Sequence, residues 1–219
     1  MKLLTLIALL ASTAMASLSA QAEVLVFHSQ AAFQAASSGL GSDSFLDVPT
    51  GDALNGPLLR QAGNQAYRVS ALDGIENQFY PVAGDNGAVW LSANRTQAHL
   101  IFDGFSASAR AIGGNFLATS YLGERWPEAR LSITLTDTSG QHSQVLDLSN
   151  ASGFLGFVST DRLMSLDIAL FDSNLTVFPT VQDFSLGLAA AVPEPTPSAL
   201  LMAGLAGLAV LTLRRHRSN

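Results

Sequence analysis

Three histidines, His28, His99 and His142, are the first side chains in the body of the chain that could do chemistry. No two of them are four residues apart, as two ligands on one helix face would be, and the H-E-x-x-H pattern is missing. This spacing favours strand or loop positions over metal ligation. A Ser-His-Asp triad stays open because its members need not be neighbours in sequence, but no G-x-S-x-G turn supports one. We therefore predict no catalytic residue and no enzymatic activity.

Carboxylates are the second group of candidates, since loop aspartates can supply oxygen ligands to Ca²⁺. The candidate ligands are Asp161, Asp172 and Asp183. The D-x-[DN]-x-[DN]-G loop of an EF-hand does not occur, and aspartate is frequent in turns for conformational reasons. We expect most of these acids to form turns or face solvent. The sequence requires no cofactor, and Ca²⁺ is the one metal ion that its residues favour.

Aromatic side chains are the third group, because an amphipathic ring can cover the apolar face of a sugar. Trp126 and Tyr121 lie in the stretch YLGERWPEAR (121–130), whose charges and proline indicate an exposed loop. The opposing interpretation is that aromatic residues fill the core of the domain, and Trp90 in AVWLSA fits it. We predict Trp126 and Tyr121 as candidate sugar-binding residues.

Composition excludes several other functions. Residues 23–192 contain seven arginines, no lysine and more than twice as many acidic residues as basic ones. Nucleic-acid binding needs clustered cations, so an acidic body without lysine argues against a nucleic-acid partner. The chain has no cysteine, which excludes thiol catalysis, thiolate zinc sites and disulfides.

Short alternating runs must position these side chains. RLSITLTD (130–137) places Leu131, Ile133 and Leu135 on one face, and MSLDIALF (164–171) gives a second apolar face. That second face comprises Met164, Leu166, Ile168 and Leu170. A period of two indicates half-buried strands, and Gly140 in DTSG predicts a hairpin between the first run and QHSQVLDLS. Further strands are expected at 23–27, 43–48, 65–71, 88–93, 98–104, 111–118, 153–159 and 180–187.

This spacing of strands, with little helical periodicity, predicts an all-β fold: a two-sheet β-sandwich of jelly-roll-like type over residues 23–190. One helix is expected in SQAAFQAASSG (29–39), with Ser29 as its N-cap and Gly39 near its C-cap. GDNG (84–87) reads as a tight turn. IGGNF (112–116) reads as a strand with a bulge or a close backbone approach.

The first 22 residues have the pattern of a secretory signal peptide. Lys2 precedes the apolar run 3–11, and small residues follow it to the A-x-A exit at 20–22. The alternative, a buried N-terminal helix, suits the run less well because the run is short. We expect cleavage by signal peptidase after Ala22 and export across the inner membrane.

The last 29 residues (191–219) combine a proline-rich joint, an apolar run and a basic tail. Residues 197–213 carry no charge and would span about 25 Å as a helix, which predicts a transmembrane helix. The arginines behind it predict a cytoplasmic C-terminus and a body on the far side of the membrane. An amphipathic helix buried in a domain is the rival interpretation, and no polar stripe supports it.

Val192, Pro193, Glu194 and Pro195, followed by the apolar span and Arg214, Arg215 and Arg217, resemble the PEP-CTERM sorting signal of Gram-negative bacteria. His216 interrupts the basic run. The resemblance implies recognition and removal by exosortase, a membrane cysteine protease or transpeptidase. It also implies transient membrane anchoring and then a place at the outer cell surface or in the extracellular matrix, associated with exopolysaccharide and biofilm.

The body resembles, more loosely, the exported β-sandwich proteins that carry this tail. The shared stretches are the predicted helix (29–36), FLGFVS (154–159) and VQDFSLG (181–187). This class has no agreed biochemical activity. We therefore expect a noncatalytic surface or matrix protein; a Ca²⁺-dependent, lectin-like carbohydrate-binding module is the alternative, and a secreted hydrolase is a third.

Overall fold

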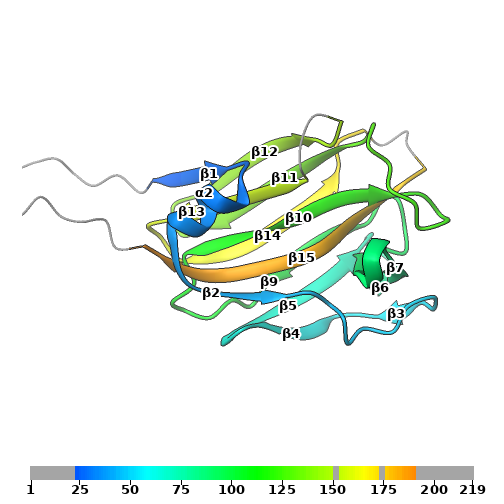
Figure 1. Ribbon diagram of the computed structural model, residues 1–219, viewed down its shortest axis with the longest axis horizontal. Coiled ribbons are helices and arrows are strands. Elements are labelled where there is room, and N and C mark those ends of the chain that lie inside the picture. Colours follow the sequence, from blue (N-terminus) through cyan, green and yellow to red (C-terminus); the bar gives the residue numbers. More distant parts are fainter. Residues whose placement is uncertain (1–22, 150–152, 173–175, 191–219) are drawn as a thin grey trace, which may run out of the picture. The chain divides into compact units, whose positions relative to one another are not determined.

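The computed structural model describes residues 23–149, 153–172 and 176–190. These residues form an all-β sandwich in which a seven-stranded sheet packs against a six-stranded sheet (Figure 1). The predicted signal peptide and C-terminal segment lie outside the described residues. Within the three described stretches, no helix has the length and apolar character needed to cross a membrane.

The seven-stranded sheet joins strands from both ends of the described chain. Its order is β1 (Val24–Phe27), β13 (Phe154–Ser159), β10 (Ala111–Thr119), β15 (Phe178–Ala189), β8 (Val89–Ser92) and β7 (Val82–Ala83), and β2 (Ser37–Asp43) also pairs with β15. Every pairing is antiparallel. The two edges of β15 therefore carry three different strands, β10 on one side and β2 and β8 in succession on the other.

The six-stranded sheet has the order β12 (Gln141–Asp147), β11 (Arg130–Asp137), β14 (Leu163–Leu170), β9 (His99–Asp103), β5 (Gln65–Leu72) and β4 (Leu58–Ala62). A small third sheet pairs β3 (Leu54–Asn55) with β6 (Gln78–Phe79). The alternation expected in β11 is confirmed, since Leu131, Ile133 and Leu135 are fully buried. Its predicted hairpin with β12 is also confirmed.

The core lies between the two sheets, and aromatic rings from both sheets meet there. Phe102 of β9 stacks on Phe184 of β15 with ring centroids 4.3 Å apart. The ring of Tyr67, from β5, lies 4.7 Å from Phe184. All three side chains are buried, so each removes a large apolar area from water. The predicted strands other than 43–48 are present, with ends within two residues of those expected.

The predicted helix is α2 (Gln30–Ala35), which begins after Ser29 as expected. It packs on the outer face of the seven-stranded sheet, where Phe33 is buried against Phe154 and Val158. The backbone of Gly156 lies directly under that ring, because a Cβ at this position would be 2.6 Å from Phe33 Cδ2. The expected C-cap at Gly39 is wrong: the helix ends at Ala35, and Gly39 belongs to β2.

Two bulges change which side chains face the core. Between β11 and β14, Thr136 pairs with Ser165 and Asp137 pairs with Leu163, so Met164 is the extra residue. The expectation that Met164 faces inward is therefore wrong: Met164 is 46% exposed, and Leu163 is buried in its place. A second bulge interrupts the pairing of β10 with β15, and its extra residue, Gln182, lies in β15. In the stretch 112–116, the alternative that was predicted, a close backbone approach, is confirmed: a Cβ at Gly114 would be 2.4 Å from the Asp183 carbonyl oxygen.

The predicted strand at 43–48 is wrong. β2 ends at Asp43, and the chain turns at once, with a backbone φ of 58° at Phe45. The Asp43 carboxylate accepts a hydrogen bond from the Phe45 amide at 3.0 Å, and the Val48 amide donates to the Phe45 carbonyl. Because short polar side chains stabilise such turns by bonding to nearby backbone, the local contacts of Asp43 override the strand pattern.

Candidate functional site

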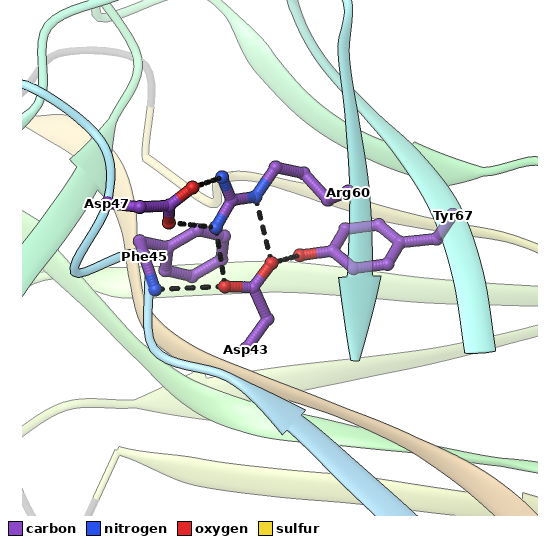
Figure 2. Close-up of polar contacts among 5 residues, drawn as sticks. All are labelled: Asp43, Phe45, Asp47, Arg60 and Tyr67. Atoms are coloured by element: carbon purple, nitrogen blue, oxygen red, sulfur yellow. Dashed lines mark hydrogen bonds and ion pairs between the residues drawn. The ribbon is translucent and has the colours of Figure 1, made fainter. Parts of the chain in front are cut away.

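A pocket of about 800 Å³ lies where β2 meets β4 and β5. Four polar side chains meet in its wall: Asp43, Asp47, Arg60 and Tyr67, called here the Arg60 cluster (Figure 2). Arg60 and Tyr67 are register partners in β4 and β5, so both point to the same side of the six-stranded sheet. Asp43 is the last residue of β2 and comes from the other sheet.

Both oxygens of the Asp43 carboxylate are fully used. Its Oδ1 accepts from the Phe45 amide and from Arg60 Nη2 at 2.7 Å. Its Oδ2 accepts from Arg60 Nε at 2.9 Å and from the Tyr67 hydroxyl at 2.6 Å. Because Asp43 is 6% exposed, these four bonds replace the water that the carboxylate loses on burial.

Arg60 is held from its other side as well. Its Nη1 and Nη2 donate to Asp47 at 2.8 and 2.7 Å, and its guanidinium lies 5.5 Å from the centre of the Phe45 ring. The hydrogen bond from Arg60 lowers the pKa of Asp47. Burial, together with the charge of Asp43, raises the pKa of the Tyr67 hydroxyl. Tyr67 therefore keeps its proton and Asp47 its charge near neutral pH.

The Arg60 cluster thus connects the two sheets by groups that satisfy one another. Sequence reasoning missed it, since it placed Asp43 and Asp47 in a strand and gave Arg60 no partner. The one signal in the sequence was that Arg60 is among the few cations of the chain. Its partners could not be predicted, since they depend on which strands lie side by side.

Trp126 and Tyr121, the predicted sugar-binding residues, follow β10 in the loop that leads to β11. Trp126 is 41% exposed and lines a pocket of about 400 Å³ together with Leu117, Arg125 and Pro127. Tyr121 is 79% exposed and belongs to a separate pocket of about 170 Å³. Both lie at the surface as expected, but they line different pockets.

Two of the three candidate Ca²⁺ ligands have carboxylates that are held in other contacts. Asp172 pairs with Arg130 at 2.9 Å, and Asp183 accepts hydrogen bonds from the backbone and side chain of Asn115. Asp161 lies in the turn between β13 and β14, where its amide donates to the hydroxyl of a neighbouring serine. Among the described residues, no three acidic or histidine side chains are grouped so that they could hold a metal ion.

One group of serine, histidine and aspartate does form, at the β11–β12 hairpin. Ser159 donates to Asp137 Oδ2 at 2.7 Å, and His142 Nε2 lies 3.6 Å from Asp137 Oδ1. Asp137 therefore lies between the other two, whereas a catalytic triad needs histidine next to the serine. Ser159 is fully buried, so this group could not present a nucleophile to a substrate. His28 is exposed, and His99 pairs with Asp167 on the outer face of the six-stranded sheet.

A further polar pocket, of about 520 Å³, lies on the outer face of the seven-stranded sheet; we call it the bulge pocket. The lining side chains used below are Ser44, Asp85, Trp90, Arg125, Gln182 and Asp183. Trp90 was expected in the core and is indeed 3% exposed. However, its neighbours Val89 and Leu91 face the core between the sheets, so the alternation of β8 directs Trp90 to the outer face.

The predicted sorting residues, Val192–Pro195 and the arginines at 214, 215 and 217, lie outside the described residues. A comparison with protein-family models gives no match, and neither does a comparison with curated proteins. Among solved structures, a family two carbohydrate esterase from Cellvibrio japonicus is similar at 13% identity with a TM-score of 0.25. The match covers 58% of this chain and 36% of that one, and at this TM-score it carries no argument about activity.

Proposed function

We propose that this is an exported, noncatalytic protein of the outer cell surface or extracellular matrix, delivered by exosortase and associated with exopolysaccharide. The observation that carries the proposal is the three-part C-terminal sequence: Val192–Pro195, the uncharged run 197–213 and the terminal arginines. The last strand of the sandwich, β15, ends at Ala189. The proposed sorting sequence therefore begins directly after the last described strand, and its removal would leave all strands of residues 23–190 intact.

The proposed route has two processing steps. Signal peptidase removes residues 1–22 during export, and the apolar run 197–213 then holds the chain in the inner membrane with its arginines in the cytoplasm. Proline disfavours helix at its own position and at the one before it, so the prolines at 193 and 195 favour an extended joint that a membrane protease could reach. Exosortase then recognises and cleaves this joint. The proposal includes no nucleic-acid partner.

Replacement of Pro193, Glu194 and Pro195 by alanine tests this route in the cells that make the protein. The expected result is a longer precursor in the membrane fraction and loss of the mature form from the cell surface and matrix. Pro197→Ala, just outside the motif, is the matched control and should be processed normally. Normal size and location of the triple variant would contradict exosortase sorting.

A second function, carbohydrate binding, is favoured by the surroundings of Trp126. Its ring is 41% exposed, and the pocket beside it combines the apolar side chains of Leu117 and Pro127 with the cation of Arg125. Aromatic surface next to polar donors suits a ring with one apolar face and hydroxyls at its edge. Such binding would hold the processed protein in a polysaccharide matrix.

Affinity electrophoresis of the full-length chain in gels that contain polysaccharide tests this second function. Trp126→Ala should weaken retardation about tenfold, because it removes the exposed ring. Leu122→Ala, an exposed apolar change in the same loop, is the control and should have no effect. A repeat with EDTA separates Ca²⁺-dependent from metal-free binding. Absence of retardation by every polysaccharide, with and without Ca²⁺, would contradict the carbohydrate-binding function.

For the fold of the body we propose the jelly-roll-like subtype of the sandwich. Its support is the antiparallel pairing of strands that are distant in sequence, such as β1 with β13 and β15 with β2.

A further inference from the structure

The bulge pocket differs from the Arg60 cluster in how its charges are used. Arg125 lines it together with Asp85 and Asp183, yet Arg125 makes no ion pair with a described residue. Asp85 likewise makes no ion pair with a described residue. Asp183 accepts hydrogen bonds from the backbone amide and side chain of Asn115 and makes no ion pair with a described residue. In the Arg60 cluster, by contrast, every charge has a partner within 3 Å.

The sequence builds this arrangement through the bulge in β15. Asn115 pairs with Asp183 and Phe116 pairs with Val181, so Gln182 is the extra residue. The bulge interrupts the alternation of the strand, and Gln182 and Asp183 both line the pocket although they are consecutive. A carboxamide and a carboxylate therefore stand next to each other at the pocket wall.

The lining also includes Trp90, on the strand β8 that pairs with β15 beside the bulge, and residues of the turn η1 (Asp85–Gly87). The indole Nε1 of Trp90 is buried and has no hydrogen-bond partner among the described residues. Gly84 lies against this ring, since a Cβ at Gly84 would be 2.3 Å from Nε1. An unpaired buried donor is rare in folded proteins. Because this nitrogen is buried against Gly84, it offers no accessible donor to the pocket, and the polar groups that line the pocket come from the other side chains.

From the polar groups that line it, above all Arg125 and Asp85 without an ion-pair partner among the described residues, we infer that the bulge pocket binds a neutral saccharide unit of a polysaccharide. Carboxylate, carboxamide and guanidinium groups together can both accept from and donate to adjacent hydroxyls of one sugar. The pocket volume, about 520 Å³, is in the usual range for a small-molecule site. The two carboxylates outnumber the one cation, so the pocket disfavours a uronic acid relative to an uncharged sugar.

The neighbouring pocket extends the site in one direction. Arg125 lines both the bulge pocket and the pocket beside Trp126. One sugar can thus be held by hydrogen bonds in the bulge pocket while an adjoining sugar covers the exposed Trp126 ring. This arrangement fits a chain of at least two linked sugars, and the inference rests on the carbohydrate-binding function proposed above.

Affinity electrophoresis of the full-length chain tests the site with three probes of stated chemistry. Galactomannan and mixed-linkage β-glucan are the neutral polymers, and polygalacturonate is the acidic one. Arg125→Ala and Asp85→Asn change the pocket. Their matched controls are Arg162→Ala and Asp52→Asn, exposed residues whose side chains make no hydrogen bond or ion pair with a described residue.

We expect the wild-type chain to be retarded by at least one neutral polymer and to be retarded less by polygalacturonate. Arg125→Ala and Asp85→Asn should each weaken binding about tenfold, the effect of losing one hydrogen bond to a charged group, while both controls bind as wild type. If all four variants bound as strongly as the wild type, the bulge pocket would not be the binding site, although the protein would still bind carbohydrate elsewhere. Stronger retardation by polygalacturonate would overturn the preference for neutral sugars. No retardation by any probe would overturn the pocket together with the carbohydrate-binding function.

Discussion

Replacement of Asp43 by alanine should strongly destabilise the sandwich, because it removes the acceptor that joins the two sheets. The carboxylate is 6% exposed and accepts hydrogen bonds from Arg60, Tyr67 and the Phe45 amide. Breaking a buried charged pair from one side lowers the free energy of unfolding by about 3–5 kcal/mol. Arg60 keeps its exposed partner Asp47, so we expect the low end, about 3 kcal/mol.

Two further substitutions in the Arg60 cluster should reduce the free energy of unfolding less than Asp43→Ala does, and they serve as comparisons. Tyr67→Phe removes one hydroxyl and leaves Asp43 with its bonds to Arg60, so it should lower the free energy of unfolding by about 1 kcal/mol. Asp47 is 73% exposed, and Asp47→Ala should therefore lower it by less than about 1 kcal/mol. In the Asp43→Ala background the Tyr67 hydroxyl has lost its acceptor, so adding Tyr67→Phe should restore stability rather than reduce it.

Urea unfolding of the full-length variants, followed by circular dichroism, measures these differences. In a domain of this size a loss of about 3 kcal/mol should lower Tm by about 6–12 °C. The reasoning would be refuted if Asp43→Ala were no more destabilising than Asp47→Ala. It would also fail if Tyr67→Phe had the same effect with and without Asp43, since the hydroxyl would then not depend on that carboxylate.

Three other predictions concern residues outside the Arg60 cluster. The hydrogen bond with Asp167 raises the pKa of His99 above its ordinary 6.5. The pair should therefore stabilise the fold by less than about 1 kcal/mol below pH 6.5, and this contribution should be lost as the pH rises through the folded-state pKa. In urea titrations, Asp167→Asn should remove this step above pH 6.5 and leave the acid dependence of other groups in place. Gly156→Ala should destabilise by about 1–3 kcal/mol, because the added Cβ meets Phe33, and unchanged thermal stability would contradict this packing. Burial raises the pKa of Asp137, but its hydrogen bonds outweigh burial and bring the pKa below 3.8. Asp137→Asn should therefore lower the free energy of unfolding by about 2 kcal/mol at pH 7. The difference in this free energy between variant and wild type should shrink in acid, as the carboxylate of the wild type becomes protonated.

The alternating strands were predictable from sequence. β11 and β14 combine a period of two with β-branched residues, and both lie in the six-stranded sheet. The exception, Met164, follows from a bulge whose position depends on the partner strand and leaves no mark in the local pattern. Residues 37–43 were not predicted as a strand because serine and glycine have low strand propensity; pairing with β15 overrides that propensity.

The candidate sites were predictable only in part. Exposure of Trp126 followed from its charged neighbours and the adjacent proline, and the structure agrees. The group of polar side chains around Arg125 was not predictable, because η1, the loop after β10 and the β15 bulge meet only in the folded chain. The proposed sorting sequence differs from these sites, because its three parts are contiguous in the chain and the prediction rests on the sequence pattern alone.

The most direct test of the account uses the two tryptophans, Trp90 and Trp126, which are the only ones in the chain. The full-length chain labelled with fluorotryptophan gives one fluorine NMR signal for each, assigned by replacing either residue with phenylalanine. Titration with the neutral oligosaccharide that corresponds to the retarding polymer should shift both signals with one common Kd. Saturable binding that leaves both signals unchanged would contradict the claim that this face of the sandwich binds polysaccharide.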